Sequence, residues 1–216
     1  MANYEILDDE KESELLKMKN ITCCFFGHRK ITVTEGLEKR LRTILKDLIE
    51  NKGVRRFIFG SRSDFDALCH TVLTEIKNTS EMAGSEQIVR VVYLTKSEYA
   101  PLEKDRKRDE KAIREVAKIE ITLQGYEEIY KPQCVFSAGK AAYIERNHKM
   151  CDDSEYCIFY FDEQYKPALG CKSGAAKTGA SGTALMYAYA RLKKKNIYNL
   201  LERAPENSDK IHRNKR

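Results

Sequence analysis

Short apolar runs alternate with longer amphipathic segments along most of the chain. The runs are rich in Ile, Val, Phe, Tyr and Cys, which is typical of strands buried on both faces of a parallel sheet. The predicted strands are residues 21–26, 56–59, 88–94, 156–161 and 196–201. Residues 127–130 are a candidate for a further short strand.

Between these runs, apolar residues recur at helical spacing. The clearest case follows Thr34, a residue type that caps helices, and ends at Gly53. Further helices are predicted over residues 65–77 and 141–153, and a densely charged, solvent-facing helix over 103–120.

The last predicted helix spans residues 183–194. Its spacing predicts that Leu185, Ala188, Tyr189 and Leu192 face inward.

Strands that alternate with helices indicate an α/β fold, here a single Rossmann-like domain with a mostly parallel sheet and helices on both faces. The length of 216 residues fits one such domain with modest tails. We expect the domain to span residues 20–202, after a tail or short helix at 1–19 and before a basic tail at 203–216.

The composition and charge of the chain limit the kinds of partner that we expect for it. Hydrophobic residues make up 42% of the chain, enough for a core, and the formal net charge is +6, part of it in the tail at 203–216. A short basic tail is usually solvated, so we do not expect nucleic acid as the partner. No apolar stretch suits a membrane span, and the first residues lack the pattern of a signal peptide.

The chain contains seven cysteines without regular spacing. Cys23, Cys24 and Cys157 lie in apolar runs, where a reduced thiol behaves as a small hydrophobic group. We therefore predict a cytoplasmic protein without disulfides.

Polar motifs follow the first two predicted strands. Gly27-His28-Arg29 ends the first strand, where glycine permits a close approach of a ligand and arginine can hold a phosphate or carboxylate. A plain strand-to-loop turn with an exposed arginine would give the same tripeptide.

The motif after the second strand has the same layout. Gly60 and Ser61 leave space and donors for a ligand, and Ser63 or Asp64 can cap the next helix. Asp66 lies in its first turn, where the helix dipole favours a carboxylate whether or not a ligand binds.

Two more candidate segments occur later. Arg146 and Asn147 lie on the helix that leads into the strand at 156–161, and Arg146 shares a face with Met150. Arg146 could reach an anionic ligand, or it could be a surface residue paired with a carboxylate such as Asp153.

Ser181-Gly182-Thr183 opens the last helix, and a helix start with small residues suits a phosphate. Lys177-Thr178, in the preceding loop at 162–180, suggests a Walker A motif, but that motif requires glycines where the chain has Cys171 and Ala176.

Metal and hydrolase motifs are not evident. His148, Cys151 and Cys157 have no suitably spaced fourth ligand, so we predict no metal ion. The chain has no G-x-S-x-G or H-E-x-x-H motif, and we predict no cofactor.

In this order, the motifs resemble those of the SLOG superfamily, named for its Smf/DprA and LOG members, and in particular its YpsA-like branch. That branch has G-H-R after a strand, a G-x-x-G-F-D-like segment, an R-N-x-x-M-V-D-x-S-D run and a G-G-T-x-x-x-x-x-Y-A helix start. The matching residues are Gly27-His28-Arg29, Asp64-Phe65-Asp66, Arg146-Asn147 with Met150, Asp152 and Ser154-Glu155, and Gly182-Thr183 with Tyr189-Ala190. The resemblance covers residues 21–201. The chain departs from it at Ser181, Cys151 and Glu155, where the branch has glycine, valine and aspartate.

The resemblance implies a Rossmann-like fold that binds a nucleotide or a nucleotide-derived ligand. The LOG enzymes hydrolyse the N-glycosidic bond of nucleoside 5′-monophosphates with a glutamate three residues after the motif threonine, where this chain has Met186. A thioether cannot stabilise a cation as a carboxylate does, nor accept a proton. The resemblance therefore implies the pocket without that chemistry.

We predict a protein that binds or senses a nucleotide-derived small molecule. Two alternatives remain: a nucleotide-processing N-glycosidase that uses Asp66 as its catalytic carboxylate, and a DNA-associated protein like the DprA branch. The sequence leaves open whether the chain forms a homo-oligomer, and we expect no membrane partner. The predicted ligand-binding residues are Gly27, His28, Arg29, Gly60, Ser61, Asp64, Asp66, Arg146, Asn147, Ser181, Gly182 and Thr183.

Overall fold

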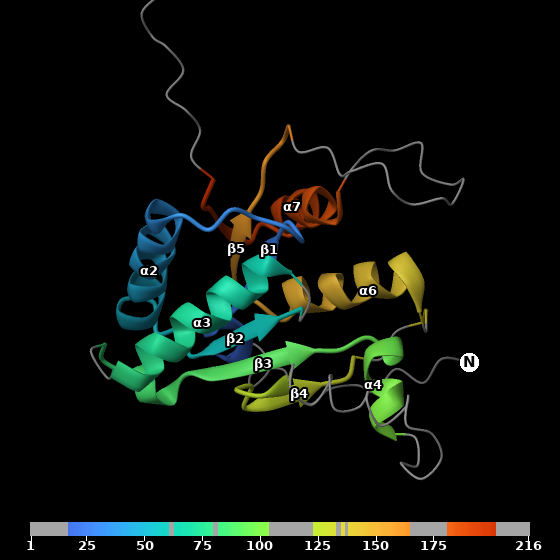
Figure 1. The fold of residues 1–216 in the computed structure, drawn as a ribbon, viewed down its shortest axis with the longest axis horizontal. Coiled ribbons are helices and arrows are strands. Elements are labelled where there is room, and N and C mark those ends of the chain that lie inside the picture. Colours follow the sequence, from blue (N-terminus) through green and yellow to red (C-terminus); the bar gives the residue numbers. More distant parts are fainter. Residues whose placement is uncertain are drawn as a thin grey trace, which may run out of the picture.

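The computed structural model describes residues 17–60, 63–79, 82–103, 123–132, 135–136, 138–164 and 181–201. Within them, six parallel strands form one sheet in the order β4-β3-β2-β1-β5-β6 (Figure 1). The strands are β1 (Thr22–Gly27), β2 (Arg56–Phe59), β3 (Val89–Tyr93), β4 (Glu128–Tyr130), β5 (Tyr156–Tyr160) and β6 (Asn196–Asn199). The sequence-based prediction of a Rossmann-like α/β fold with a mostly parallel sheet is confirmed, and the candidate strand at 127–130 is the edge strand β4.

Alternation along β1 sends side chains to two faces of the sheet. Cys23 and Phe25 join a core beneath α2 (Glu35–Glu50) and α3 (Asp64–Thr79), whereas Cys24 and Phe26 join a second core. Helices α6 (Gly139–Asp152) and α7 (Gly182–Leu192) contribute side chains to that second core. Both faces are therefore covered by helices, as predicted. The described residues also include α4 (Lys96–Glu103) and the 3₁₀ turn η1 (Ser85–Gln87).

Two of the predicted helix caps are present. Thr34 accepts a hydrogen bond from the backbone N–H of Leu37 at the start of α2, and the Ser63 hydroxyl accepts one from the N–H of Asp66 at the start of α3. Each cap satisfies an N–H group that has no partner inside its helix.

The predicted inward face of the last helix is wrong for Leu185, Ala188 and Leu192, whereas Tyr189 packs against the second core. The buried residues of α7 are Thr183, Met186 and Ala190, whereas Leu185 is 38% exposed and Leu192 is 76% exposed. The hydroxyl of Thr183 donates a hydrogen bond to the backbone oxygen of Gly27 at 3.0 Å. This contact fixes the rotation of α7 and turns both leucines away from the core.

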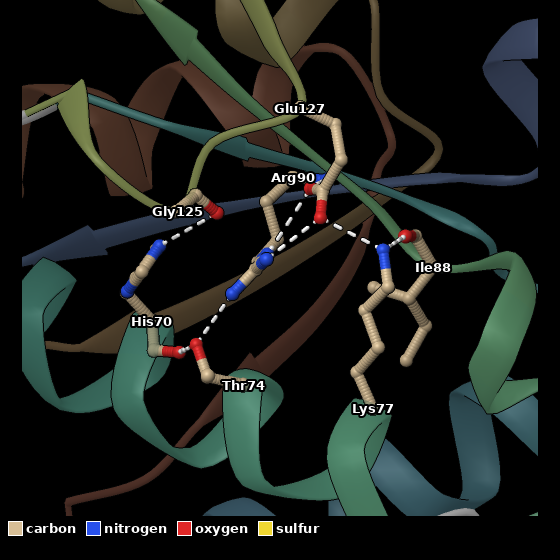
Figure 2. A network of polar contacts seen from close by, with 7 residues as sticks. All are labelled: His70, Thr74, Lys77, Ile88, Arg90, Gly125 and Glu127. Carbon is tan, nitrogen blue, oxygen red and sulfur yellow. Dashed lines mark hydrogen bonds and ion pairs between the residues drawn. The ribbon is translucent and has the colours of Figure 1, made fainter.

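A polar network anchors the segment before β4 to the neighbouring helix (Figure 2). Arg90 of β3 donates to both carboxylate oxygens of Glu127, and Lys77 of α3 donates to the same carboxylate at 2.7 Å. Burial raises the pKa of Glu127, but these hydrogen bonds outweigh burial and bring the pKa to about 2. His70 contacts the backbone oxygen of Gly125 at 3.3 Å and completes the attachment.

Several sequence-based predictions fall outside the described residues. They concern Ser61, the charged segment at 103–120 beyond residue 103, most of the loop at 162–180, and the tails at 1–16 and 203–216. The described cysteines, Cys23, Cys24, Cys69, Cys151 and Cys157, are all free and buried. Within the described part of the chain, no helix combines the length and apolar character needed to cross a membrane.

Candidate functional site

A cleft of about 470 Å³ opens at the carboxyl ends of β1 and β2. The chain moves outward from β1 through β2, β3 and β4, then returns to place β5 on the other side of β1. Such a switch point in the strand order is where open parallel sheets bind ligands. The cleft is lined by Phe25, Phe26, Gly27, His28, Arg29, Gly60, Ser63, Asp66, Lys140, Tyr143, Arg146, Asn147, Met150, Ser181, Gly182 and Thr183.

The structure brings together every predicted site residue except Ser61 and Asp64. Ser61 lies outside the described residues, and Asp64 does not line the cleft. The carboxylate of Asp64 instead pairs with Lys30 at 3.3 Å. The prediction that Gly27, Gly60 and Gly182 lie around one cleft is confirmed, while their role in binding stays a prediction.

The N-terminus of α7 forms one wall of the cleft. Ser181 caps the helix by accepting a hydrogen bond from the N–H of Ala184 at 3.1 Å. Thr183 ties this turn to the end of β1 through Gly27. Among the described residues, and apart from its chain neighbours and the backbone of α7 itself, no atom lies within 4 Å of the position that a Cβ would take at Gly182, so open space faces the helix start within this part of the chain.

The end of β1 forms the floor. A Cβ at Gly27 would collide with the ring and Cβ of Phe65, so only glycine lets α3 pack this closely against β1. The next residue, His28, is 3% exposed, and its Nε2 accepts a hydrogen bond from the backbone N–H of Asp162 at 3.2 Å. Because the donor is an amide, this nitrogen carries no proton.

The pKa of His28 lies below its ordinary value because burial disfavours the imidazolium, against a smaller opposing effect of Asp162. A lowered histidine pKa means that the unfolded chain binds more protons than the folded one below about pH 6.5. The stability that neutral His28 contributes is therefore present above that pH and is lost as the pH falls.

We expect the free energy of unfolding to fall between pH 7.5 and pH 5.5, and to fall less in His28→Gln, whose side-chain oxygen can still accept the Asp162 N–H. The pKa of His70 is also lowered mainly by burial, so His70 contributes to the pH dependence of the free energy of unfolding in both proteins. Urea titrations at several pH values measure how steeply the free energy of unfolding changes with pH in each protein. The two slopes can differ by at most about 1.4 kcal/mol per pH unit, because the proteins differ by one titrating histidine. Equal slopes in the two proteins would contradict this role of His28.

Asp66 brings a carboxylate to the cleft from the first turn of α3. Its Oδ2 accepts a hydrogen bond from the Ser63 hydroxyl at 2.8 Å, and the residue is 9% exposed. Burial raises the pKa of Asp66, although the hydrogen bond from Ser63 and the charge of Arg146 act in the opposite direction. The side chain is thus held in one orientation at the edge of the cleft.

Arg146 ties α6 to the ends of β2 and β3. Its Nη1 donates to the backbone oxygen of Gly60 and lies 3.5 Å from that of Tyr93. The same nitrogen is 3.6 Å from the carboxylate of Glu98, a residue only 3% exposed. The guanidinium also donates to Oδ1 of Asn147 at 2.9 Å.

These contacts correct the sequence-based view of Arg146. Arg146 has a protein partner that the sequence did not indicate, the buried carboxylate of Glu98, while a contact with a ligand stays a prediction. Asp153, the alternative partner considered from the sequence, instead binds Lys149 and the hydroxyl of Tyr93. Arg146 still lines the cleft, so it can be both a structural residue and part of the site.

Sequence reasoning missed the residues that position Arg146. Glu98 accepts hydrogen bonds from the backbone N–H and the hydroxyl of Thr95 at 2.8 and 2.9 Å, and the first of these is the glutamate half of a capping box at the start of α4. The Thr-x-x-Glu spacing after β3 was the available signal. Lys140 and Tyr143 were also missed, although both line the cleft and Tyr143 shares a helix face with Arg146.

Metal ligation finds no support in the described part of the chain, where no group of three or more His, Cys, Asp or Glu side chains is placed to hold an ion. His148 stacks on Tyr189 with ring centroids 4.0 Å apart, and the Cys24 thiol contacts that of Cys157 at 3.5 Å inside the core. The cleft combines a helix N-terminus, the cations Arg29, Lys140 and Arg146, and a single buried carboxylate. Such a site can bind an anion without covalent chemistry.

Comparisons with known proteins give limited information. No family model matches the chain, and no curated protein matches it. Among solved structures, the chain is similar to DNA processing protein A from Helicobacter pylori, described for its single-stranded DNA binding mode, with 16% identity and a TM-score of 0.44. The match covers 95% of this chain and 81% of that one, and it is too distant to support an argument about function.

Proposed function

We propose that the cleft binds the phosphate group of a nucleotide or nucleotide-derived small molecule. The observation that carries the proposal is the start of α7, which faces open space at Gly182 within a cleft at the switch point of the sheet. The first N–H groups of a helix have no partner within it and lie at the positive end of the helix dipole. Arg29 and Lys140 add positive charge to the same cleft.

The proposal includes membership of the SLOG superfamily and its YpsA-like branch. Its support is the order of the motifs along the chain together with their convergence on one cleft. Ser181 replaces the first glycine of the branch motif, yet it caps α7 and leaves Gly182 open. The substitution is therefore compatible with a phosphate at this helix start.

A binding or sensing role is favoured over N-glycosidase activity. Met186, at the position of the LOG glutamate, is 1% exposed and packs in the second core, away from the cleft lining. Asp66 is the carboxylate that lines the cleft, so it is the candidate for any such reaction. Release of free base from a nucleoside monophosphate would establish that alternative.

A thermal-shift screen with AMP, ADP, ATP, NAD and ADP-ribose tests the proposal. We expect at least one compound to raise the melting temperature, since a ligand at a hundredfold excess over its Kd adds about 2.7 kcal/mol to stability. Stabilisation by single-stranded DNA that falls steeply with salt, with no effect of any nucleotide, would instead favour the DNA-associated alternative. No shift with any nucleotide would contradict the proposal.

A further inference from the structure

The carboxylate of Asp66 has one oxygen that the protein leaves unsatisfied. Oδ2 accepts the hydroxyl of Ser63, whereas Oδ1 is buried and has no hydrogen-bond partner in the described part of the chain. Buried polar atoms in folded proteins almost always have a partner, so each exception requires a reason. In the same part of the chain, the one other such side-chain atom is the Ser85 hydroxyl, which does not line the cleft.

The position of Asp66 indicates what supplies the missing partner. Asp66 lines the cleft from the side of β2 and α3, and Ser63 holds its carboxylate in place. A phosphate is repelled by an ionised carboxylate and is better bound at the start of α7 or by the cations. The group that meets Asp66 must therefore donate a hydrogen bond and carry no negative charge.

We propose that Oδ1 of Asp66 accepts a hydrogen bond from an uncharged donor on the same ligand whose phosphate binds at α7. This inference rests on the proposed function and assigns the cleft a second subsite. Two parts of a nucleotide have this chemistry: the hydroxyls of the sugar and the exocyclic amino group of the base. Asp66 thus makes the site selective for ligands that combine a phosphate with such a donor.

The selectivity follows from burial. Because Oδ1 is already buried in the free protein, an analogue without the donor loses the hydrogen bond and leaves this oxygen without a partner, whereas the parent compound satisfies it. We expect that analogue to bind about tenfold to a hundredfold more weakly than its parent.

Calorimetric titration of matched compounds tests the inference. AMP is compared with 2′-deoxy-AMP and 3′-deoxy-AMP, which lack one hydroxyl each, and with IMP, which lacks the amino group. Ribose 5-phosphate and 2-deoxyribose 5-phosphate repeat the hydroxyl comparison without a base. Each compound is measured on the wild type, on Asp66→Ala and on Asp66→Asn.

We expect one analogue to lose about tenfold or more in affinity on the wild type and less than about twofold on Asp66→Ala, which lacks the acceptor. Loss with a deoxy analogue assigns the donor to the sugar, and loss with IMP assigns it to the base. Asp66→Asn, which can place its amide oxygen at the Oδ1 position, should retain part of the discrimination. Asp64→Ala is the matched control, because Asp64 is in the same helical turn but does not line the cleft.

Failure of the Asp66 subsite and failure of the proposed function give different results. Equal affinities of all analogues for the wild type, or losses of the same size on the wild type and Asp66→Ala, would overturn the Asp66 subsite while leaving phosphate binding intact. No binding of any phosphate compound to the wild type or Asp64→Ala would overturn the proposed function and this inference together. If circular dichroism shows that Asp66→Ala is unfolded, Asp66→Leu, which has no acceptor and a larger apolar side chain, replaces it in the same comparison with the wild type.

Discussion

Replacing Arg146 with alanine is expected to destabilise the protein by about 3–5 kcal/mol, because the change removes one member of a buried ion pair and several buried hydrogen bonds. Glu98 is 3% exposed and lies 3.6 Å from the guanidinium, and the backbone oxygens of Gly60 and Tyr93 lose the same donor. Urea-induced unfolding of the wild type and the variant measures the difference.

Glu98→Gln, alone and combined with Arg146→Ala, separates the effect of the ion pair from the effect of losing the arginine side chain. Glu98→Gln removes the buried carboxylate charge but keeps an oxygen that can accept from Thr95. We expect Arg146→Ala to cost less in the Glu98→Gln background than in the wild type, since the attraction between the two charges is already absent there. A cost below about 1 kcal/mol for Arg146→Ala in the wild type would instead indicate a surface ion pair and contradict the structural role of this arginine.

The strands were predictable because a strand buried on both faces of a parallel sheet is apolar throughout. The run at 21–26 became β1 (Thr22–Gly27), whose side chains fill both cores. The glycines of the site were predictable for a related reason. Ligand loops of such sheets follow the strand ends, and Gly27 and Gly60 stand at two of those ends.

The inward face of α7 was not predictable from hydrophobicity. Leu185 and Leu192 are more apolar than Thr183, yet the threonine hydroxyl binds the Gly27 carbonyl and fixes the rotation of the helix. Small residues such as Ala190 then face the sheet. A polar contact between residues far apart in the sequence decided the side of the helix.

The partner of Arg146 was not predictable either, because this contact also joins residues far apart in the sequence. Glu98 lies on α4, distant in the sequence from α6, and a single sequence carries no local signal that the two charges meet. The capping box at Thr95 predicts a helix start but not which charge the glutamate faces. Motif spacing could therefore assemble the residues of the cleft, but not the contacts that hold them there.

Gly182→Asp is expected to abolish phosphate binding while the fold is retained. Beyond the adjoining residues and the backbone of α7, no atom of the described part of the chain is within 4 Å of the position of the new Cβ, so the side chain fits there. A carboxylate in the first turn of α7 is favoured by the helix dipole by about 0.3–1 kcal/mol, and the variant should be at least as stable as the wild type. The same carboxylate occupies the place of the phosphate and repels it, which typically costs several kcal/mol, or a loss of about a hundredfold or more in affinity.

Gly36→Asp provides the matched control. Gly36 is an exposed glycine in the first turn of α2, with ordinary contact to Arg40 at the Cβ position, and it does not line the cleft. The two variants therefore add the same charge at the same kind of helix start. We expect Gly36→Asp to bind the nucleotides found in the thermal-shift screen as the wild type does.

Isothermal titration of the tightest-binding nucleotide from that screen into the wild type, Gly36→Asp and Gly182→Asp is the most direct test of a phosphate site at the start of α7. The account predicts equal affinities for the first two proteins and no measurable binding to the third, with all three folded by circular dichroism. A folded Gly182→Asp protein that binds this nucleotide as tightly as the wild type would contradict it.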